Sequence, residues 1–329
     1  MNKLLFTTYD GILIGYELEQ ADDGVKFNQF INSQEATTPL KSVVQINGSI
    51  FVSVNCNVHK YSLSTKKLMH VIELKDKVDF LYVLSDYLLV AHSGTVECYD
   101  QSGNHLQTYK TKFERVNCIC KYSETSFIVL YKNNLTAFCL NQNSPLAVQR
   151  VKADYFYCQQ LNSTDIMLLS EAKLSKYNLQ AGTQVDFNGL NFNSSFSTEK
   201  MHFIGTTEGN LIVLDTDMKK KKMFNTVEGR IKKIFQVEED IFCLISSNGA
   251  IQIFGYDSEA NEAFVVGEQM LVKRLVDGIN VKESAEEEEL AEAGEQGEEQ
   301  EEDIEEELEE MFGEEEGEEE WEEIDMGKA

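Results

Sequence analysis

The chain has 329 residues and a net charge of −28, and 42% of its residues are hydrophobic. This length and hydrophobic content are sufficient for a substantial core, in one domain, in two domains or in an array of repeats. The sequence has no run of roughly 18 apolar residues, and a strand-like segment follows directly after Asn2 and Lys3. We therefore expect no membrane span, no secretory signal and no secretion.

The acidic residues are concentrated at the end of the chain. Residues 283–329 contain 26 of the 57 acidic residues and one of the 29 basic residues, which leaves a charge of only −3 on residues 1–282. Glu-rich segments with few apolar residues cannot bury enough surface to offset the loss of chain entropy on folding. We therefore expect a folded domain over residues 1–282 and a disordered acidic tail over residues 283–329.

Seven similar segments follow one another along the chain, each with two apolar runs joined by a short turn. In Met201–Asp217 the turn Thr206–Gly209 separates the two runs, a pattern that is typical of a β-hairpin. The copies lie roughly 40 residues apart, which is the repeat period of β-propellers. They are Leu4–Leu18, Ile50–Leu63, Tyr87–Asp100, Phe127–Leu140, Ile166–Leu179, Met201–Asp217 and Ile241–Asp257.

A further alternating segment precedes most of these hairpins, and a shorter segment follows most of them. Lys41–Ile46, Lys77–Leu84 and Arg230–Val237 are preceding segments, and Leu68–Leu74 and His105–Lys110 are following segments. Four strands in each of seven repeats predict an all-β, seven-bladed β-propeller. The scarcity of proline, with only two in the chain, agrees with a fold that consists mostly of sheet.

The two ends of this array are expected to close the ring. The first hairpin begins at Leu4, so no inner strand precedes it, whereas residues 270–281 form an additional strand without a hairpin. We predict that strand 270–281 completes the first blade, since closure removes the exposed strand edges of an open array. The alternative is that these residues are a loose linker to the acidic tail.

The repeats resemble the WD-repeat propellers in their spacing, over all seven blades. The Trp-Asp pair that usually ends the third strand is absent, and pairs such as Tyr99-Asp100, Leu214-Asp215 and Tyr256-Asp257 stand in its place. The Gly-His pair that usually opens a repeat is also missing. We therefore expect the buried hydrogen-bond network of that histidine to be absent or replaced.

The layout of several segments is similar to one family of WD-repeat proteins in particular. The segments are PLKSVVQINGSIFVSV, RVNCICKY, LSKYNLQAGTQV and GRIKKIF. Together they resemble the p21-activated-kinase-interacting-protein family, whose members are nucleolar factors in assembly of the large ribosomal subunit. The resemblance implies a scaffold in the nucleolus without catalysis.

No motif in the sequence indicates an enzyme or a metal site. There is no phosphate-binding Gly loop, no GxSxG and no HExxH motif, and the five histidines are scattered. Cys118 and Cys120 are expected on one face of a strand, without the two further ligands that a zinc site requires. The odd number of cysteines favours free thiols in a reducing compartment. We expect no catalytic residue, no metal and no cofactor.

One charge pattern in the repeats is a candidate binding site. Four cations each stand immediately before the first apolar residue of a predicted inner strand, which in the WD-repeat layout lies near one rim of the central channel. We predict that this rim binds a partner, although basic residues at exposed strand starts are also ordinary surface. The four cations are Lys77, Arg115, Arg230 and Arg274. A second cluster, Lys219–Lys222, is expected in a solvated turn.

The acidic tail contains apolar residues that solubility alone does not require. Their spacing is i, i+4, i+7 and i+8, which places them on one face of a helix, and the only tryptophan of the chain follows. We predict that these residues anchor a basic protein partner, with folding on binding. They are Ile304, Leu308, Met311, Phe312 and Trp321.

These observations leave three hypotheses for the function. The first is a non-enzymatic scaffold in assembly of the large ribosomal subunit, a monomer within a larger complex of pre-ribosomal proteins, with RNA contact. The second is an acidic-tailed chaperone for a basic client, either a ribosomal protein or a histone. The third is an adaptor in a signalling or trafficking complex. The expected location is the nucleus or nucleolus, with the cytoplasm as the alternative.

Overall fold

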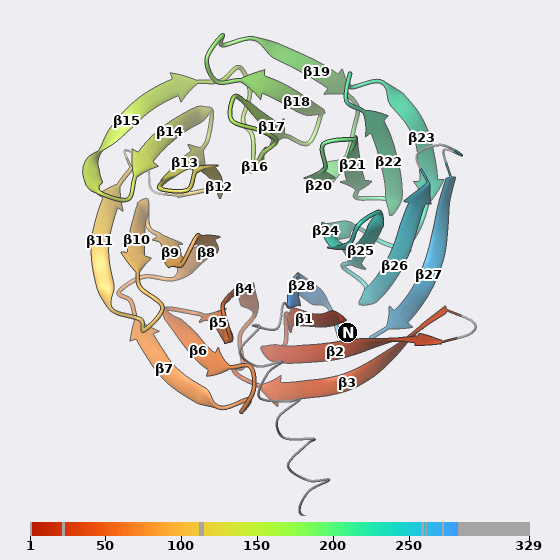
Figure 1. Ribbon diagram of the computed structural model, residues 1–329, viewed down its shortest axis with the longest axis horizontal. Helices are drawn as coiled ribbons and strands as arrows, with labels where there is room; N and C mark the ends of the chain where they lie inside the picture. The colour runs from red at the N-terminus through yellow and green to blue at the C-terminus, as the bar shows by residue number, and fades with distance from the viewer. Residues whose placement is uncertain are drawn as a thin grey trace, which may run out of the picture. The chain divides into compact units, whose positions relative to one another are not determined.

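The computed structural model describes residues 2–21, 24–111, 115–257, 260, 262–271 and 273–281 (Figure 1). Within these ranges 28 strands form seven sheets of four strands each, arranged as blades around a central axis. The described residues include no α-helix, and accordingly no helix that could cross a membrane. The prediction of an all-β, seven-bladed propeller is confirmed.

Each blade is an antiparallel meander whose first strand lies nearest the axis and whose fourth strand lies at the circumference (Figure 1). From the inner to the outer strand, the blades are β28 (Leu275–Val281), β1 (Asn2–Thr8), β2 (Ile12–Ala21) and β3 (Gly24–Gln34) in blade 1; β4 (Leu40–Ile46), β5 (Ser49–Val54), β6 (Asn57–Ser62) and β7 (Leu68–Glu73) in blade 2; β8 (Val78–Leu84), β9 (Tyr87–His92), β10 (Thr95–Tyr99) and β11 (His105–Lys110) in blade 3; β12 (Cys118–Ser123), β13 (Ser126–Tyr131), β14 (Asn134–Cys139) and β15 (Gln142–Arg150) in blade 4; β16 (Tyr157–Gln160), β17 (Asp165–Leu169), β18 (Lys173–Asn178) and β19 (Gln184–Asn188) in blade 5; β20 (Phe192–Ser197), β21 (Met201–Thr206), β22 (Asn210–Asp215) and β23 (Lys220–Asn225) in blade 6; and β24 (Ile231–Glu238), β25 (Ile241–Ser246), β26 (Ala250–Asp257) and β27 (Glu262–Met270) in blade 7.

Blade 1 is assembled from both ends of the described chain. Strand β28 pairs antiparallel with β1, from Lys3 opposite Val281 to Thr7 opposite Asp277. The closing strand is shorter than the expected 270–281, because Met270 still pairs within blade 7 and ends β27. Pairing with β28 satisfies the inner edge of β1, which would otherwise be an exposed strand edge inside the ring.

A second contact between blades 7 and 1 lies at the circumference. The hairpin of β2 and β3 is longer than the other hairpins, and its end reaches β27 (Figure 1). Gly24 has a φ of 135°, and a Cβ atom on it would lie 2.5 Å from the Val266 carbonyl oxygen. Val25 and Phe27 pack there with Val266 against the core shared by the two blades. Only glycine permits this close approach of the two backbones.

The hydrophobic core is divided among the spaces between neighbouring blades. Between blades 6 and 7, for example, the ring centroids of Phe203 and Phe242 are 4.5 Å apart, and Phe254 packs beside both. All three side chains are at most 2% exposed. Since each blade buries both of its faces against its neighbours, removal of one strand exposes apolar surface on two blades.

A ring of hydrogen bonds between side chains and backbone groups also joins the inner strands. Such bonds occur at all seven junctions between neighbouring blades, and they satisfy polar groups on the inner edge of each sheet. In chain order the bonds are Leu81 N to Ser42 Oγ (3.4 Å), Lys121 N to the Tyr82 hydroxyl (2.9 Å), Asn117 Nδ2 to Tyr155 O (2.9 Å), Gln159 Nε2 to Ser197 O (2.8 Å), Ser194 Oγ to Ile231 O (3.0 Å), Asn280 Nδ2 to Val237 O (2.8 Å) and Val43 N to Asp277 Oδ2 (3.1 Å).

Tyrosine networks occur within the blades, where the WD-repeat layout would place Trp and His. In blade 2 the Tyr61 hydroxyl donates to Glu35, and His59 Nδ1 lies 3.1 Å from the same hydroxyl. In blade 3 the Tyr99 hydroxyl donates to Glu97, whose Oε1 atom is 3.2 Å from His92 Nε2. Tyr61 and Tyr99 belong to the pairs that replace Trp-Asp in the sequence.

A third network joins blades 4 and 5 through a tyrosine of the connecting loop. The Tyr155 hydroxyl is 2.8 Å from Ser175 Oγ, which donates to Asp186 Oδ1 at 2.6 Å. Lys173 Nζ lies 3.2 Å from the other oxygen of Asp186. Tyrosine-centred hydrogen bonds therefore form three networks among the described residues, in a chain that lacks the Gly-His pair.

Candidate partner-binding face

All seven inner strands run in the same direction, so the two faces of the disc carry different loops. Asn117 Nδ2 donates to the Tyr155 carbonyl just before β12 and β16 begin, and Gln160 Nε2 donates to the Tyr122 carbonyl near their other ends, both at 2.9 Å. We call the face where the inner strands begin the top face, and the opposite one the bottom face. The top face also carries the turns between the second and third strands and the connections to the next blade.

The four predicted rim cations all lie on the top face. Lys77, Arg230 and Arg274 directly precede β8, β24 and β28, while Arg115 stands three residues before β12. All four side chains are exposed, and none has a hydrogen bond or ion pair with another described residue.

The rim cations form two pairs rather than a continuous ring. Lys77 and Arg115 lie at the starts of the neighbouring strands β8 and β12, and Arg230 and Arg274 lie at the starts of β24 and β28 on the other side of the channel (Figure 1). The inner strands of blades 5, 6 and 2 separate the pairs. A single partner contacting all four cations would therefore have to span the channel.

The surroundings of the two pairs differ in charge. Near Arg230 and Arg274, the carboxylate of Asp10 is 3.2 Å from Lys273 Nζ, and the side chain of Glu228 is exposed. Around Lys77 and Arg115, the described connections, turns and outer-strand ends expose seven cations, and the only exposed acids there are Glu73, Asp76 and Asp154. We call these seven cations the basic sector: Lys75, Lys77, Lys110, Arg115, Lys132, Arg150 and Lys152.

The sequence predicts a turn for the whole lysine cluster of blade 6, but only Lys219 lies outside a strand. Lys220 to Lys222 belong to β23, the outer strand of the blade. Acids and an aromatic ring accompany the cluster: Lys221 Nζ is 3.4 Å from Asp215, and Lys222 Nζ is 5.2 Å from the Phe224 ring centroid. The side chains of this strand are largely solvated, so the period-2 alternation of apolar residues that indicates a strand is weak in it.

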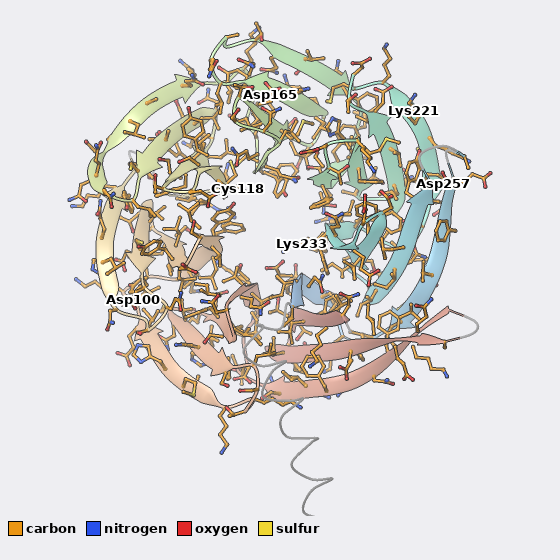
Figure 2. The ribbon with its side chains drawn as sticks, in the orientation of Figure 1. Asp100, Cys118, Asp165, Lys221, Lys233 and Asp257 are labelled. Carbon is orange, nitrogen blue, oxygen red and sulfur yellow. The ribbon has the colours of Figure 1, made fainter. Side chains whose placement is uncertain are left out.

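The central channel contains a cavity of about 650 Å³ lined by inner strands of several blades. Lys233 (Figure 2) and Asp277 both line this cavity, and their side chains form an ion pair. The Asp277 carboxylate also accepts a bond from Val43 N, and its backbone N–H donates to Thr7 Oγ1 at 3.1 Å. Asp277 thus ties β28 to blades 2 and 7. No local pattern in the sequence marks this ion pair, because the two residues lie 44 positions apart.

No group of three or more His, Cys, Asp or Glu side chains within the described ranges is arranged to hold a metal ion. Cys118 and Cys120 lie on the same face of β12, 2% and 3% exposed, in the core between blades 4 and 5. The predicted tail contacts Ile304, Leu308, Met311, Phe312 and Trp321 lie outside the described residues.

His202, in β21, gives the fold a specific sensitivity to acid. Burial and the charge of Lys176 lower its pKa from 6.5 to about 4, against the opposing effect of Asp215, and neither ring nitrogen has a hydrogen-bond partner among the described residues. The unfolded chain binds more protons at this site between pH 6.5 and 4, so the free energy of unfolding falls as the pH drops through that range. Above pH 6.5 His202 is neutral in both the folded and the unfolded chain, so it causes no loss of stability there.

We expect the loss to be on the order of 2 kcal/mol between pH 7 and pH 5. Urea unfolding at pH 7.0, 6.0 and 5.0 measures it, in a range where most carboxylates still stay ionised. A His202→Leu chain should show a flatter dependence than the natural chain. Identical slopes in the two chains would mean that His202 is not responsible.

Comparisons with known proteins identify the architecture. No family model and no curated protein matches the chain. Among solved structures, the chain is similar to that of U3-55K (TM-score 0.62, 12% identity, 70% of this chain and 83% of that chain), and to the crystal structure of the RRP9 WD40 repeats (TM-score 0.63, 12% identity, 82% and 86%). It is also similar to the β-propeller domain of Cps50 (Swd1) from Myceliophteria thermophila (TM-score 0.52, 12% identity, 60% and 73%).

At 12% identity these likenesses concern the fold. The fold therefore agrees with the resemblance to WD-repeat propellers in repeat spacing, although the chain lacks the Trp-Asp and Gly-His pairs. The finer resemblance to the p21-activated-kinase-interacting-protein family stays a prediction. The chain is a seven-bladed β-propeller with WD40-repeat structural neighbours.

Proposed function

We propose that the chain is a non-enzymatic scaffold that works in assembly of the large ribosomal subunit, in the nucleolus. One observation carries the proposal: the basic sector gathers seven exposed cations against three acids on one side of the top face. Loops on a rigid frame of strands are common places for binding residues. The layout of segments that resembles the ribosome-assembly family supports the choice of process.

The basic sector suits a partner with a negatively charged surface. Folded residues 1–282 have a charge of only −3, so the local excess of cations is a feature of this sector and not of the whole domain. An RNA backbone or an acidic protein segment within a pre-ribosomal particle has the complementary charge. The 26 acidic residues of 283–329 have the opposite chemistry, which suits a basic ribosomal protein. Two binding regions of opposite charge would let one chain join two kinds of partner.

The composition of residues 283–329 also favours a second function, that of a chaperone for one basic client. Affinity purification of three tagged chains separates the two functions: the full chain, residues 1–282 and residues 283–329. The scaffold predicts that residues 1–282 still recover pre-ribosomal particles, because the basic sector and every described strand are retained. If only chains containing 283–329 recover anything, and they recover one basic protein, the chaperone function replaces the scaffold.

A further inference from the structure

Three of the seven cysteines converge on one wall of the central channel. Cys118 (Figure 2) and Cys120 come from β12 of blade 4, Cys158 comes from β16 of blade 5, and all three line the channel cavity. The Cys118 thiol donates a hydrogen bond to the Cys158 carbonyl oxygen, with 3.5 Å between sulfur and oxygen. The side chains are only 2–3% exposed, so only a small reagent that enters the cavity can reach them.

The surroundings make these thiols chemically unequal. The hydrogen bond that Cys118 receives from the Cys158 thiol, together with the charge of Lys233, holds the pKa of Cys118 below its ordinary value, although burial opposes them. Burial, and the hydrogen bonds to Cys118 and Cys120, raise the pKa of Cys158 well above its ordinary value. A thiolate is a far better nucleophile than a thiol, so Cys118 is the group that reacts first with a small electrophile.

We propose that Cys118 and Cys158 form a peroxide-sensitive modification site, at which oxidation links blades 4 and 5 by a disulfide. The Cys118 thiolate attacks one oxygen of hydrogen peroxide, the O–O bond breaks, and the leaving hydroxide takes a proton to become water. The product is a sulfenic acid on Cys118. The Cys158 sulfur then attacks the Cys118 sulfur, the S–O bond breaks, and a second water leaves with the Cys158 proton. The two thiols lose two electrons in total, and peroxide gains them.

The link would change the molecule at a defined place. It would covalently join two inner strands that neighbouring side chains already hold together through Asn117 and Gln160. A disulfide between residues 118 and 158 closes a long loop in the unfolded chain, which raises stability. The inference concerns the channel wall and is independent of the proposed role in ribosome assembly.

The experiment uses the full chain carrying Cys56→Ser and Cys139→Ser, which removes the two cysteines that are not fully buried. After hydrogen peroxide treatment and alkylation, a tryptic digest is analysed without reduction. The expected product is a cross-linked peptide pair containing Cys118 and Cys158, lighter than the two separate peptides by two hydrogens and separated again by a thiol reductant. The oxidised chain should also melt several degrees higher than the reduced chain.

Two further variants assign the bond, because Cys118 and Cys120 fall on the same tryptic peptide, between Arg115 and Lys121. In the same background, Cys120→Ser should keep the cross-link and Cys118→Ser should lose it. A thermal midpoint measured under reducing conditions shows that each variant is folded. The proposal is overturned if folded protein keeps both thiols alkylatable after peroxide treatment, or if Cys120→Ser rather than Cys118→Ser abolishes the cross-link.

Discussion

A chain that ends at Arg274 will unfold at a much lower temperature than a chain that ends at Lys282, and we expect a difference on the order of 10 °C or outright aggregation. The shorter chain lacks β28, whose Leu275 and Val281 are at most 4% exposed. It also loses Asp277, which ties blade 1 to blades 2 and 7. The inner edge of β1 is then left without a partner.

Thermal unfolding followed by circular dichroism measures this difference, with light scattering to detect aggregation. The chain ending at Lys282 is the matched control, because it lacks the acidic segment but keeps all described strands. The unfolding midpoint of an Asp277→Ala chain should lie between those of the two truncated chains, since this variant keeps β28 but leaves Lys233 without its partner. Equal midpoints for the two truncated chains would show that β28 does not close the ring.

Reversal of three charges in the basic sector, by Lys77→Glu, Arg115→Glu and Arg150→Glu, is expected to reduce capture of the propeller-bound partner about tenfold or more. Each exposed cation contributes little by itself, but the reversal turns the sector from a net charge of +4 to −2, so attraction becomes repulsion. The three side chains are exposed, so stability should be unchanged. Quantitative affinity purification at low and high salt measures the effect.

The matched control reverses three exposed cations of the bottom face, by Lys67→Glu, Lys200→Glu and Lys219→Glu. It changes the total charge by the same amount and leaves the top face intact. We expect this chain to retain the partner. If both triple variants lose the partner equally, net charge and not the basic sector controls binding.

Apolar runs joined by short turns were sufficient to predict the seven hairpins and therefore the blade number. Hairpins such as Phe127–Leu140 and Ile241–Asp257 are buried on both faces, so they stand out as apolar runs. Strand β20, with the sequence FNSSFS, has no such pattern. Hydrogen bonds of Asn193 and Ser194 to the Ile231 carbonyl, and of Gln159 to Ser197, hold it in place. Those bonds join residues of different blades, so no local sequence pattern predicts them.

The candidate site was predictable only in part, for a related reason. Position along the chain places Lys77, Arg115, Arg230 and Arg274 at strand starts, and the common direction of the inner strands puts them on one face. Which of them have acidic neighbours depends on loops that are distant in sequence, such as Asp10 beside Lys273. The basic sector became visible only when Lys132 and Arg150 of blade 4 were placed beside the connections that carry Lys77 and Arg115.

Cross-linking of the assembled complex shows whether the basic sector contacts the partner. The complex is purified on the tagged full chain and treated with an amine-reactive cross-linker, and the lysines linked to a partner are identified by mass spectrometry. We expect Lys75, Lys77, Lys132 and Lys152 of the basic sector to carry most of the links from the propeller, or to lose reactivity where RNA covers them. Partner links from Lys67, Lys200 and Lys219 of the bottom face, with the basic sector still fully reactive, would contradict it.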